Sequence, residues 1–182
     1  MLRFKPSIRF PEKVFLPQGT EIVFKEENGF KGIFQMSASL NIFPLFLKKF
    51  QFTRLNSEKW ECVLQFSSLH ISTEEIGSFS LYINHMNHFL TSLKVMFALM
   101  RSLKRVVVFY DFDQGQENPG QEASFRFGSQ HKDQALFCHE IEQLRSKLHF
   151  PEQELFLHID IPPCGKRWQT VTISLELDEK WP

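Results

Sequence analysis

Two carboxylates separated by one residue are the strongest candidate for catalytic chemistry in this sequence. Asp111 and Asp113 stand at the end of a predicted buried strand, residues 106–112, which is rich in β-branched and aromatic side chains. Because side chains alternate along a strand, both carboxylates point to the same side, where such oxygen ligands can hold Mg²⁺. A Mg-dependent phosphoryl-transfer enzyme centred on the Asp-x-Asp at 111–113 is therefore one alternative for the function. The competing interpretation is a strand that ends in solvated carboxylates, and we favour it.

The sequence around these carboxylates, VVVFYDFDQG at residues 106–115, resembles the nucleophile strand of haloacid-dehalogenase-type phosphatases. The resemblance implies phosphatase activity. The sequence departs from the family's pattern because no Thr follows Asp113, and the later residues lack the Ser/Thr, Lys and paired Asp on alternating strands and helices. We therefore do not transfer the activity, and we expect a protein that is not an enzyme.

Histidine spacing offers two candidate metal sites. His85 and His88 are three residues apart on one face of a predicted helix, but no Cys, Asp or Glu nearby completes the ligand set that zinc needs. His158 and Asp160 have the His-x-Asp spacing of an iron(II) oxygenase site, yet no later histidine supplies the remaining ligand. Glycine-rich phosphate loops of the GxGxxG and GxxxxGK[ST] kinds do not occur. We expect no metal, no cofactor and no small-molecule substrate.

The cysteines and the N-terminal residues indicate the compartment. Cys62, Cys138 and Cys164 are widely separated and form neither a complete set of disulfides nor a CxxC pair, so we interpret them as reduced, buried thiols. The first residues, MLRFKPSIRF, carry charges and a proline where a signal peptide needs an apolar core. No apolar run reaches the ~18 residues of a membrane span. These features predict an intracellular protein, cytoplasmic or nuclear, with no membrane span.

A long apolar helix is predicted at about residues 85–103. Its main apolar stripe, expected to cover a sheet, contains Met86, Phe89, Leu90, Leu93, Met96, Phe97, Met100 and Leu103. Val95 and Leu99 lie off this stripe, so we expect them to form an exposed apolar patch that binds a partner. Residues 76–110 contain no Asp or Glu. The basic side chains that complete the predicted partner-binding set are Lys94, Arg101, Lys104 and Arg105.

The charge of the whole chain is balanced, with 21 Lys and Arg against 21 Asp and Glu. Strong nucleic-acid binders carry a basic excess, so this balance weakens that class without removing it. The basic face of the predicted central helix can still contact phosphates. An accessory nucleic-acid-binding protein that uses this face is the second alternative for the function.

Most of the remaining sequence predicts strands. An Asn-Gly pair at 28–29 separates apolar runs at 20–25 and 30–36, which predicts a hairpin because a type I′ turn needs positive φ at both central residues. Further strands are expected at residues 45–54 and 60–67, as a second hairpin, and at 106–112 and 123–127. A strand is also expected at 78–83, and the alternative is that the central helix already begins within residues 76–84, because the apolar spacing there fits both. Residues 154–161 and 168–178 alternate apolar and polar side chains, which predicts an antiparallel pair.

These elements predict an α+β fold with a largely antiparallel sheet, a β-meander in the N-terminal half, and two main helices at about residues 85–103 and 130–148. We expect a single domain over residues 1–182, with a split near residues 113–121 as the alternative. The function that fits best is that of a non-catalytic binding protein, a subunit or adaptor of a macromolecular assembly. The expected partner is a protein, in a hetero- or homo-oligomer, and a nucleic acid is the alternative partner.

Overall fold

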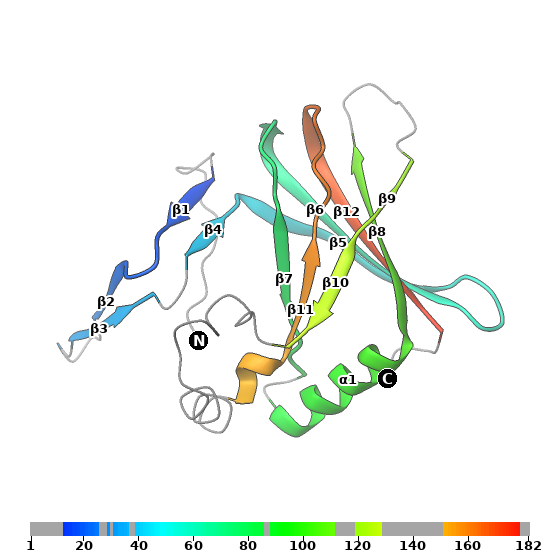
Figure 1. The fold of residues 1–182 in the computed structure, drawn as a ribbon, viewed down its shortest axis with the longest axis horizontal. Helices are drawn as coiled ribbons and strands as arrows, with labels where there is room; N and C mark the ends of the chain where they lie inside the picture. The colour runs from blue at the N-terminus through cyan, green and yellow to red at the C-terminus, as the bar shows by residue number, and fades with distance from the viewer. Residues whose placement is uncertain are drawn as a thin grey trace.

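The computed structural model describes residues 13–25, 29, 31–36, 39–85, 88–111, 119–128 and 151–178. In these residues two β-sheets pack into the body of the molecule, a helix lies at one end of the body, and an arm extends to one side (Figure 1). The described part is mostly β-sheet with one α-helix, which agrees with the predicted mixture of helix and antiparallel sheet. The second predicted helix, at 130–148, lies outside the described residues.

The larger sheet has five antiparallel strands in the order β5-β6-β12-β8-β9. They are β5 (Leu45–Arg54), β6 (Trp60–Ser72), β8 (Leu103–Asp111), β9 (Gln121–Glu122) and β12 (Trp168–Leu177). The predicted hairpin of residues 45–54 and 60–67 is confirmed as β5 and β6. In the central strand β12, Ile173 pairs with Leu64 of β6 and Val108 of β8. These three residues are buried, so they form one apolar row on the inner face of the sheet.

The smaller sheet has three antiparallel strands in the order β10-β11-β7. They are β7 (Ser78–Tyr82), β10 (Ser124–Phe127) and β11 (Phe156–Asp160), and a 3-10 turn η2 (Pro151–Glu154) precedes β11. The prediction that residues 154–161 and 168–178 pair with each other is wrong, because β11 and β12 lie in different sheets. The proline-containing connection between them crosses from the smaller sheet to the larger one. Both strands alternate apolar and polar side chains, and that alternation does not specify which neighbour each strand takes.

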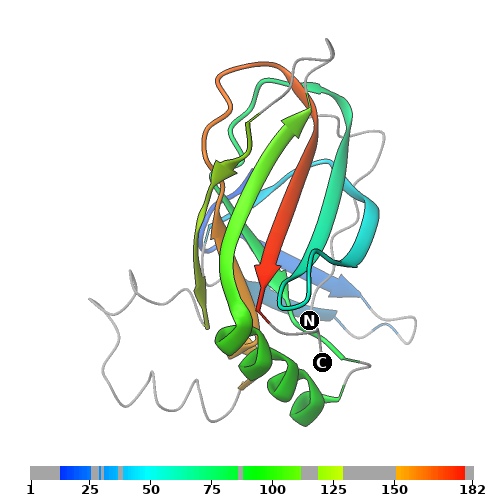
Figure 2. The same ribbon diagram turned by 90° about the vertical axis from the view of Figure 1, so that its right-hand side faces the viewer.

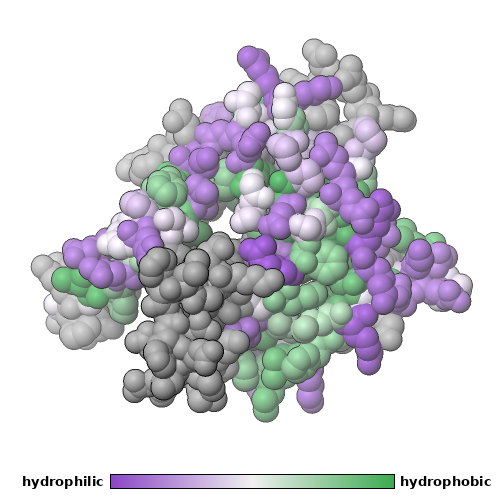
Figure 3. Space-filling model, in the orientation of Figure 1, coloured by the Kyte–Doolittle hydropathy of each residue, from purple (hydrophilic) through white to green (hydrophobic). Residues whose placement is uncertain are grey.

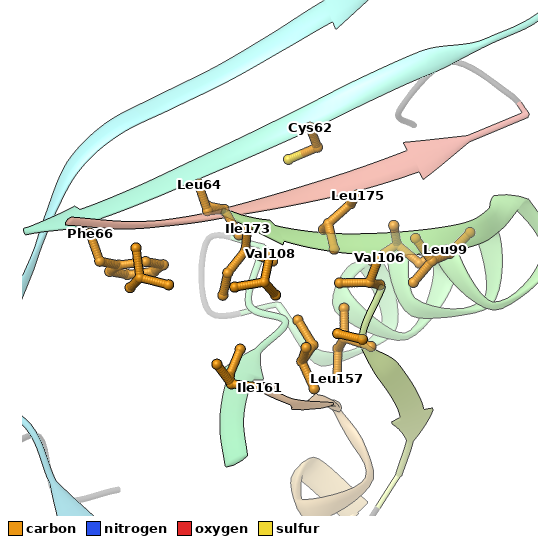
Figure 4. Packing of buried hydrophobic residues seen from close by; sticks show 14 of the residues in the cluster. Cys62, Leu64, Phe66, Leu99, Val106, Val108, Leu157, Ile161, Ile173 and Leu175 are labelled. Atoms are coloured by element: carbon orange, nitrogen blue, oxygen red, sulfur yellow. The ribbon is translucent and has the colours of Figure 1, made fainter. Parts of the chain in front are cut away.

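The core lies between the two sheets (Figure 4). Leu157 and Ile161, from the β11 segment, point toward Ile173 and Val108 of the larger sheet (Figure 4). Alternate residues of β6 are buried, as expected for a strand with one face in the core; they are Cys62, Leu64, Phe66 and Ser68. The rings of Phe66 and Phe79, 4.8 Å apart between centroids, join β6 to β7 across the interface. The two inner faces therefore interlock as in a β-sandwich.

The helix α1 (Phe89–Ser102) lies across one end of the two sheets (Figure 2). It begins at Phe89, later than the predicted start at about residue 85, and His88 caps its N-terminus. The Nδ1 atom of His88 accepts the backbone N–H of Thr91 at 3.3 Å. The hydroxyl of Ser92 accepts the backbone N–H of His85 at 2.8 Å, and both bonds satisfy donors near the start of the helix.

The C-terminal end of α1 leads directly into a strand. The helix ends at Ser102, and β8 begins at the next residue, Leu103. The backbone N–H of Leu103 donates to the carbonyl of Leu99 and closes the last helical turn. The strand therefore begins earlier than the predicted start at residue 106.

The arm consists of two separate antiparallel ribbons. One is the predicted hairpin, formed by β2 (Glu21–Lys25) and β3 (Lys31–Gln35), and the other pairs β1 (Val14–Leu16) with β4 (Leu40–Ile42). Gly29 has φ of 85°, the positive value that the hairpin turn requires. The prediction of one β-meander in the N-terminal half is wrong, because these ribbons do not join the sheet that contains β5 and β6.

Both sheets of the body combine strands from either side of residues 113–121. The larger sheet contains β8 from before this segment and β12 from after it, and the smaller sheet contains β7 and β11 in the same way. A domain boundary at 113–121 would separate hydrogen-bonded neighbours in both sheets.

Candidate protein-interaction surfaces

The arm exposes large apolar side chains on both faces of one ribbon. In the β2–β3 hairpin Val23 lies directly opposite Ile33, and their exposed fractions are 60% and 66%. Phe34, next to Ile33 and therefore on the other face, is 55% exposed and lies opposite Ile22. The sequence contained a signal for this surface, because apolar residues occupy consecutive positions in both strands. A strand with one buried and one solvated face would alternate instead.

The second ribbon of the arm has the same character. Phe15 and Leu40 are large, exposed apolar residues of β1 and β4. Within the described residues β1 pairs with β4 and β2 pairs with β3, so the outer edges of both ribbons carry backbone groups that no other described strand pairs. An isolated two-stranded ribbon is marginally stable in water. Contact with another chain would therefore stabilise the arm.

A hollow of about 420 Å³ lies where the arm joins the body. Its lining includes Lys13 and Phe43 on the arm side and Glu74 and Trp168 on the body side. The ammonium group of Lys13 lies 5.7 Å from the centroid of the Phe43 ring, and the indole N–H of Trp168 donates to the backbone carbonyl of Glu74 at 3.0 Å. Among the described residues, the Oε2 atom of Glu74 is buried without a hydrogen-bond partner. The hollow thus places a cation and a carboxylate beside the arm.

The structure corrects the predicted orientation of α1. Val95 and Leu99, expected to form an exposed patch, are 8% and 1% exposed and belong to the core. The helix is rotated relative to the prediction because its segment from Leu93 to Met100 is apolar nearly all round. The periodicity alone then leaves open which side packs on the sheets. The side that meets the sheets is centred on Val95 and Leu99.

The rotation leaves a different apolar row on the outside of α1. We define the α1 stripe as Leu90, Leu93, Phe97 and Met100. Leu90 is 61% exposed, Phe97 59% and Met100 49%, while Leu93 is partly buried. Hydrophobic surface accordingly gathers over α1 in the space-filling view (Figure 3). Three of the eight residues that the sequence assigned to the core therefore face solvent.

The four predicted basic residues divide between two elements. Lys94 and Arg101 are exposed on α1, whereas Lys104 and Arg105 belong to the strand β8. Lys104 forms an ion pair with Asp178 at 3.2 Å. Arg105 forms ion pairs with two carboxylates, Glu122 at 3.4 Å and Glu176 at 3.5 Å. Because acidic neighbours offset at least two of the four charges, the basic face that the nucleic-acid alternative requires is smaller than predicted.

The structure brings no metal-binding set together in the residues it describes. Asp111 is exposed at the end of β8, and Asp113 lies outside the described residues. His85 and His88 are the candidate zinc ligands three residues apart. The Nδ1 atom of His88 instead accepts a hydrogen bond as the N-cap of α1. Within the described part of the chain, no group of three or more His, Cys, Asp or Glu could hold a metal ion.

His158 is the buried histidine of the described chain, and its contacts show a structural role that the sequence did not reveal. Its Nε2 lies 2.7 Å from the carbonyl of Gly128, which can only accept, so Nε2 carries the proton. Its Nδ1, 2.8 Å from the hydroxyl of Ser80, then accepts. Burial lowers the pKa of His158 below 6.5, although the bond to Gly128 acts in the opposite direction. The neutral ring therefore links β11 to β7 and to the end of β10, and nearby Asp160 pairs with Arg126 at 3.4 Å.

Two of the three cysteines are described, and both are buried free thiols. Burial, with a smaller contribution from the charge of Glu61, raises the pKa of the Cys62 thiol to about 11. Cys164 is also buried, and Cys138 lies outside the described residues. The predicted reduced and buried state holds for Cys62 and Cys164.

None of the helices in the described part of the chain is long and apolar enough to cross a membrane.

Comparison with known proteins identifies a similar fold. The chain resembles a chain in the structure of the type VI secretion system TssK-TssF-TssG baseplate subcomplex, with a TM-score of 0.66 and 14% sequence identity. The match covers 94% of this chain and 34% of that chain, so this chain spans about a third of the length of its structural neighbour. No protein-family model and no curated protein matches the sequence. At this identity the likeness concerns the fold.

Proposed function

We propose that this chain is a non-catalytic subunit of a macromolecular assembly and that it binds a partner protein through its arm. The observation that carries this proposal is the β2–β3 ribbon, which presents Val23 and Ile33 on one face and Phe34 on the other. Scattered exposed apolar residues are normal on a protein surface, but a two-stranded ribbon that is apolar on both faces has no core of its own. A partner supplies that core.

The energetics of burial favour this role. Full burial of a Val, Ile or Phe side chain is worth roughly 1.5–3 kcal/mol relative to exposure, so a partner that covers the ribbon gains several such contributions. The outer edges of the ribbons can also extend a partner's sheet through backbone hydrogen bonds. The partner is a different protein or a second copy of this chain, and the assembly is intracellular, cytoplasmic or nuclear. Reduced, buried Cys62 and Cys164 are consistent with that location.

The similar fold of a chain in the TssK-TssF-TssG baseplate subcomplex supports a role in an assembly, because that neighbour is described as part of a multi-protein baseplate subcomplex. The match covers only 34% of the neighbouring structure's chain. The similarity therefore supports membership of an assembly but does not identify the partner. An adaptor function fits the same surface. The proposal assigns no catalytic step to the chain.

The test combines a contact map with a variant. A photo-crosslinking residue replaces Ile33 in the full-length chain expressed in its native source, and crosslinked products are identified by mass spectrometry. The matched control places the same residue at Lys48, which is exposed on β5 of the body. We expect one dominant product at position 33, either another protein or a second copy, that does not form from position 48.

The Val23→Lys, Ile33→Lys variant provides the second arm of the test. It places two charges on one face of the ribbon and leaves the core residues unchanged, so the melting temperature of the body should stay within about 2 °C of wild type. Gln35→Lys, an exposed polar position on β3, is the charge control. Size-exclusion chromatography with light scattering should show loss of the complex for the apolar variant and retention for the control. Equal crosslinking at positions 33 and 48, or an intact complex with the double variant, would contradict the proposal.

A further inference from the structure

The hollow beside the arm has a preorganised body side. The β5–β6 register places Leu45 opposite Ser68, and both residues line the hollow. The β12–β6 register places Trp168 opposite Ser72, and these two residues line it as well. The backbone N–H of Glu74 donates to the hydroxyl of Ser72 at 3.1 Å, and the carbonyl of Glu74 accepts the indole N–H of Trp168 at 3.0 Å. A ligand that enters the hollow therefore meets side chains whose positions are already set.

The carboxylate on this side lacks a donor. The Oε2 atom of Glu74 is buried and has no hydrogen-bond partner among the described residues. Burying a charged oxygen without a donor is unfavourable, so a ligand that supplies a donor gains more here than at an exposed carboxylate. The terminal torsion of a glutamate side chain is soft, and either carboxylate oxygen can turn toward the hollow. Glu74 is thus a suitable acceptor for an ammonium group.

The arm side of the hollow carries the opposite charge. Lys13 is exposed, and its ammonium group lies 5.7 Å from the centroid of the Phe43 ring. Both residues line the hollow, as Glu74 does. Within the described part of the chain, Lys13 and Glu74 form no ion pair with each other. An ammonium group has three donors, so Lys13 can bind a carboxylate that enters the hollow.

Apolar side chains form much of the remaining lining. They are Phe43, Pro44, Leu45, Ile71 and Trp168. Ile71 is 49% exposed, so a ligand that covers it removes apolar surface from water. The hollow therefore combines an acceptor for a cation, a donor for an anion and an apolar wall, within a volume of about 420 Å³.

We propose that the hollow binds a small zwitterion, an α-amino acid with an apolar side chain. The ammonium group of the ligand donates to Glu74, its carboxylate accepts from Lys13, and its side chain packs on the apolar wall. A purely cationic ligand would meet Lys13 as a like charge, and a purely anionic ligand would meet Glu74 in the same way. A ligand with both charges avoids both penalties. A largely apolar lining with a few polar groups that fix orientation is the usual composition of a small-molecule site.

This site is independent of the partner proposed for the arm. Val23 and Ile33, which carry that proposal, are not among the residues that line the hollow. The Val23→Lys, Ile33→Lys variant should therefore bind the amino acid as wild type does, even if it has lost its assembly partner. Loss of either interaction can thus be observed separately from loss of the other.

The test titrates three related ligands into the isotope-labelled full-length chain and follows the indole N–H of Trp168 by NMR. L-leucine carries both charges, L-leucinamide carries only the positive charge, and N-acetyl-L-leucine carries only the negative charge. The titrations are run at about pH 6.5, where a free α-amino group is protonated. We expect L-leucine to bind at least about tenfold more tightly than either derivative, with the difference shrinking as salt is added.

Two variants separate the contributions of the two charges. Glu74→Gln should weaken binding of L-leucine at least about tenfold and leave N-acetyl-L-leucine no weaker, because that ligand has no ammonium group. Lys13→Met should weaken L-leucine to a similar extent and leave L-leucinamide no weaker. Glu74→Gln preserves the shape of the side chain and Lys13 is exposed, so both variants should fold. Glu75→Gln, at the exposed neighbouring carboxylate, is the matched control and should bind L-leucine as wild type does.

Equal affinity for the three ligands would refute the proposal. Unchanged binding of L-leucine by both Glu74→Gln and Lys13→Met would refute it as well, and so would the absence of a saturable shift at millimolar L-leucine. If L-leucinamide bound as tightly as L-leucine and only Glu74→Gln removed the binding, the hollow would be a simple cation site instead.

Discussion

The orientation of α1 can be tested by comparing two apolar residues two positions apart in the sequence. Leu99 is 1% exposed and Phe97 is 59% exposed, although both belong to the same apolar segment. Leu99→Ala removes about three carbon groups at roughly 0.8 kcal/mol each and leaves a cavity between α1 and the sheets. The expected loss of unfolding free energy is therefore about 2–5 kcal/mol. Phe97→Ala removes a larger side chain that the solvent already surrounds, and we expect a change below about 1 kcal/mol.

The assay is urea unfolding followed by intrinsic fluorescence and circular dichroism, with the slope m checked for equality between variants. For a chain of this length a loss of 3 kcal/mol lowers the melting temperature by roughly 6–12 °C, so thermal scans provide a second readout. Val95→Ala and Leu90→Ala form a replicate pair with the same buried and exposed contrast. If Phe97→Ala destabilised the protein as much as Leu99→Ala, the outer side of α1 would be packed as well, which would refute the orientation of the helix described above.

Three further outcomes follow from individual groups. Burial lowers the pKa of His158 below 6.5, so just below that pH the unfolded chain binds more protons than the folded chain. The contribution of this residue to the free energy of unfolding is therefore complete above about pH 6.5 and falls as the pH is lowered. Urea titrations between about pH 7.5 and 5.5, roughly one unit either side of that value, should show a steeper loss for wild type than for His158→Gln. Parallel curves would contradict the assignment of a neutral ring. Cys62, with a pKa of about 11, should be a thiolate in about one molecule in a thousand at pH 8. We therefore expect iodoacetamide to label it only after unfolding. Rapid labelling of the folded protein, detected by mass spectrometry, would show instead that the thiol is accessible. Tyr110→Phe removes the hydroxyl that donates to the carbonyl of Pro162 at 2.8 Å and should cost about 1 kcal/mol of unfolding free energy, measured in urea; an unchanged midpoint would show that this bond is replaced by water.

Local signals in the sequence predicted the strands well. The Asn-Gly pair that ends at Gly29 gave the first hairpin, because the required positive φ is a property of the turn itself. The alternation of β12 predicted that Ile173 and Leu175 are buried, because alternate side chains of a strand share one face, although Ser174 between them is buried as well in this central strand. Each of these predictions depends on residues that are close in the sequence.

Partner choice between distant elements could not be predicted in the same way. β11 and β12 are both apolar and separated by a short connection, so an antiparallel pair and a crossing between two sheets agree equally with their sequences. The orientation of α1 failed for a related reason: Val95 and Phe97 are both apolar, and only the sheets beneath the helix distinguish them. The arm surface at Val23 and Ile33 does have a local signal, because consecutive apolar residues place apolar side chains on both faces of a strand.

The junction between α1 and β8 determines how a mechanical load would pass through the molecule. No residue separates Ser102 from Leu103, so a force applied to the helix reaches the strand without slack. The strand lies beside the central strand β12, and antiparallel hydrogen bonds run perpendicular to the strand direction. A pull along β8 loads these bonds together in shear, whereas a pull across the sheet would break them one after another. The helix is thus attached to the body at a point suited to bearing tension.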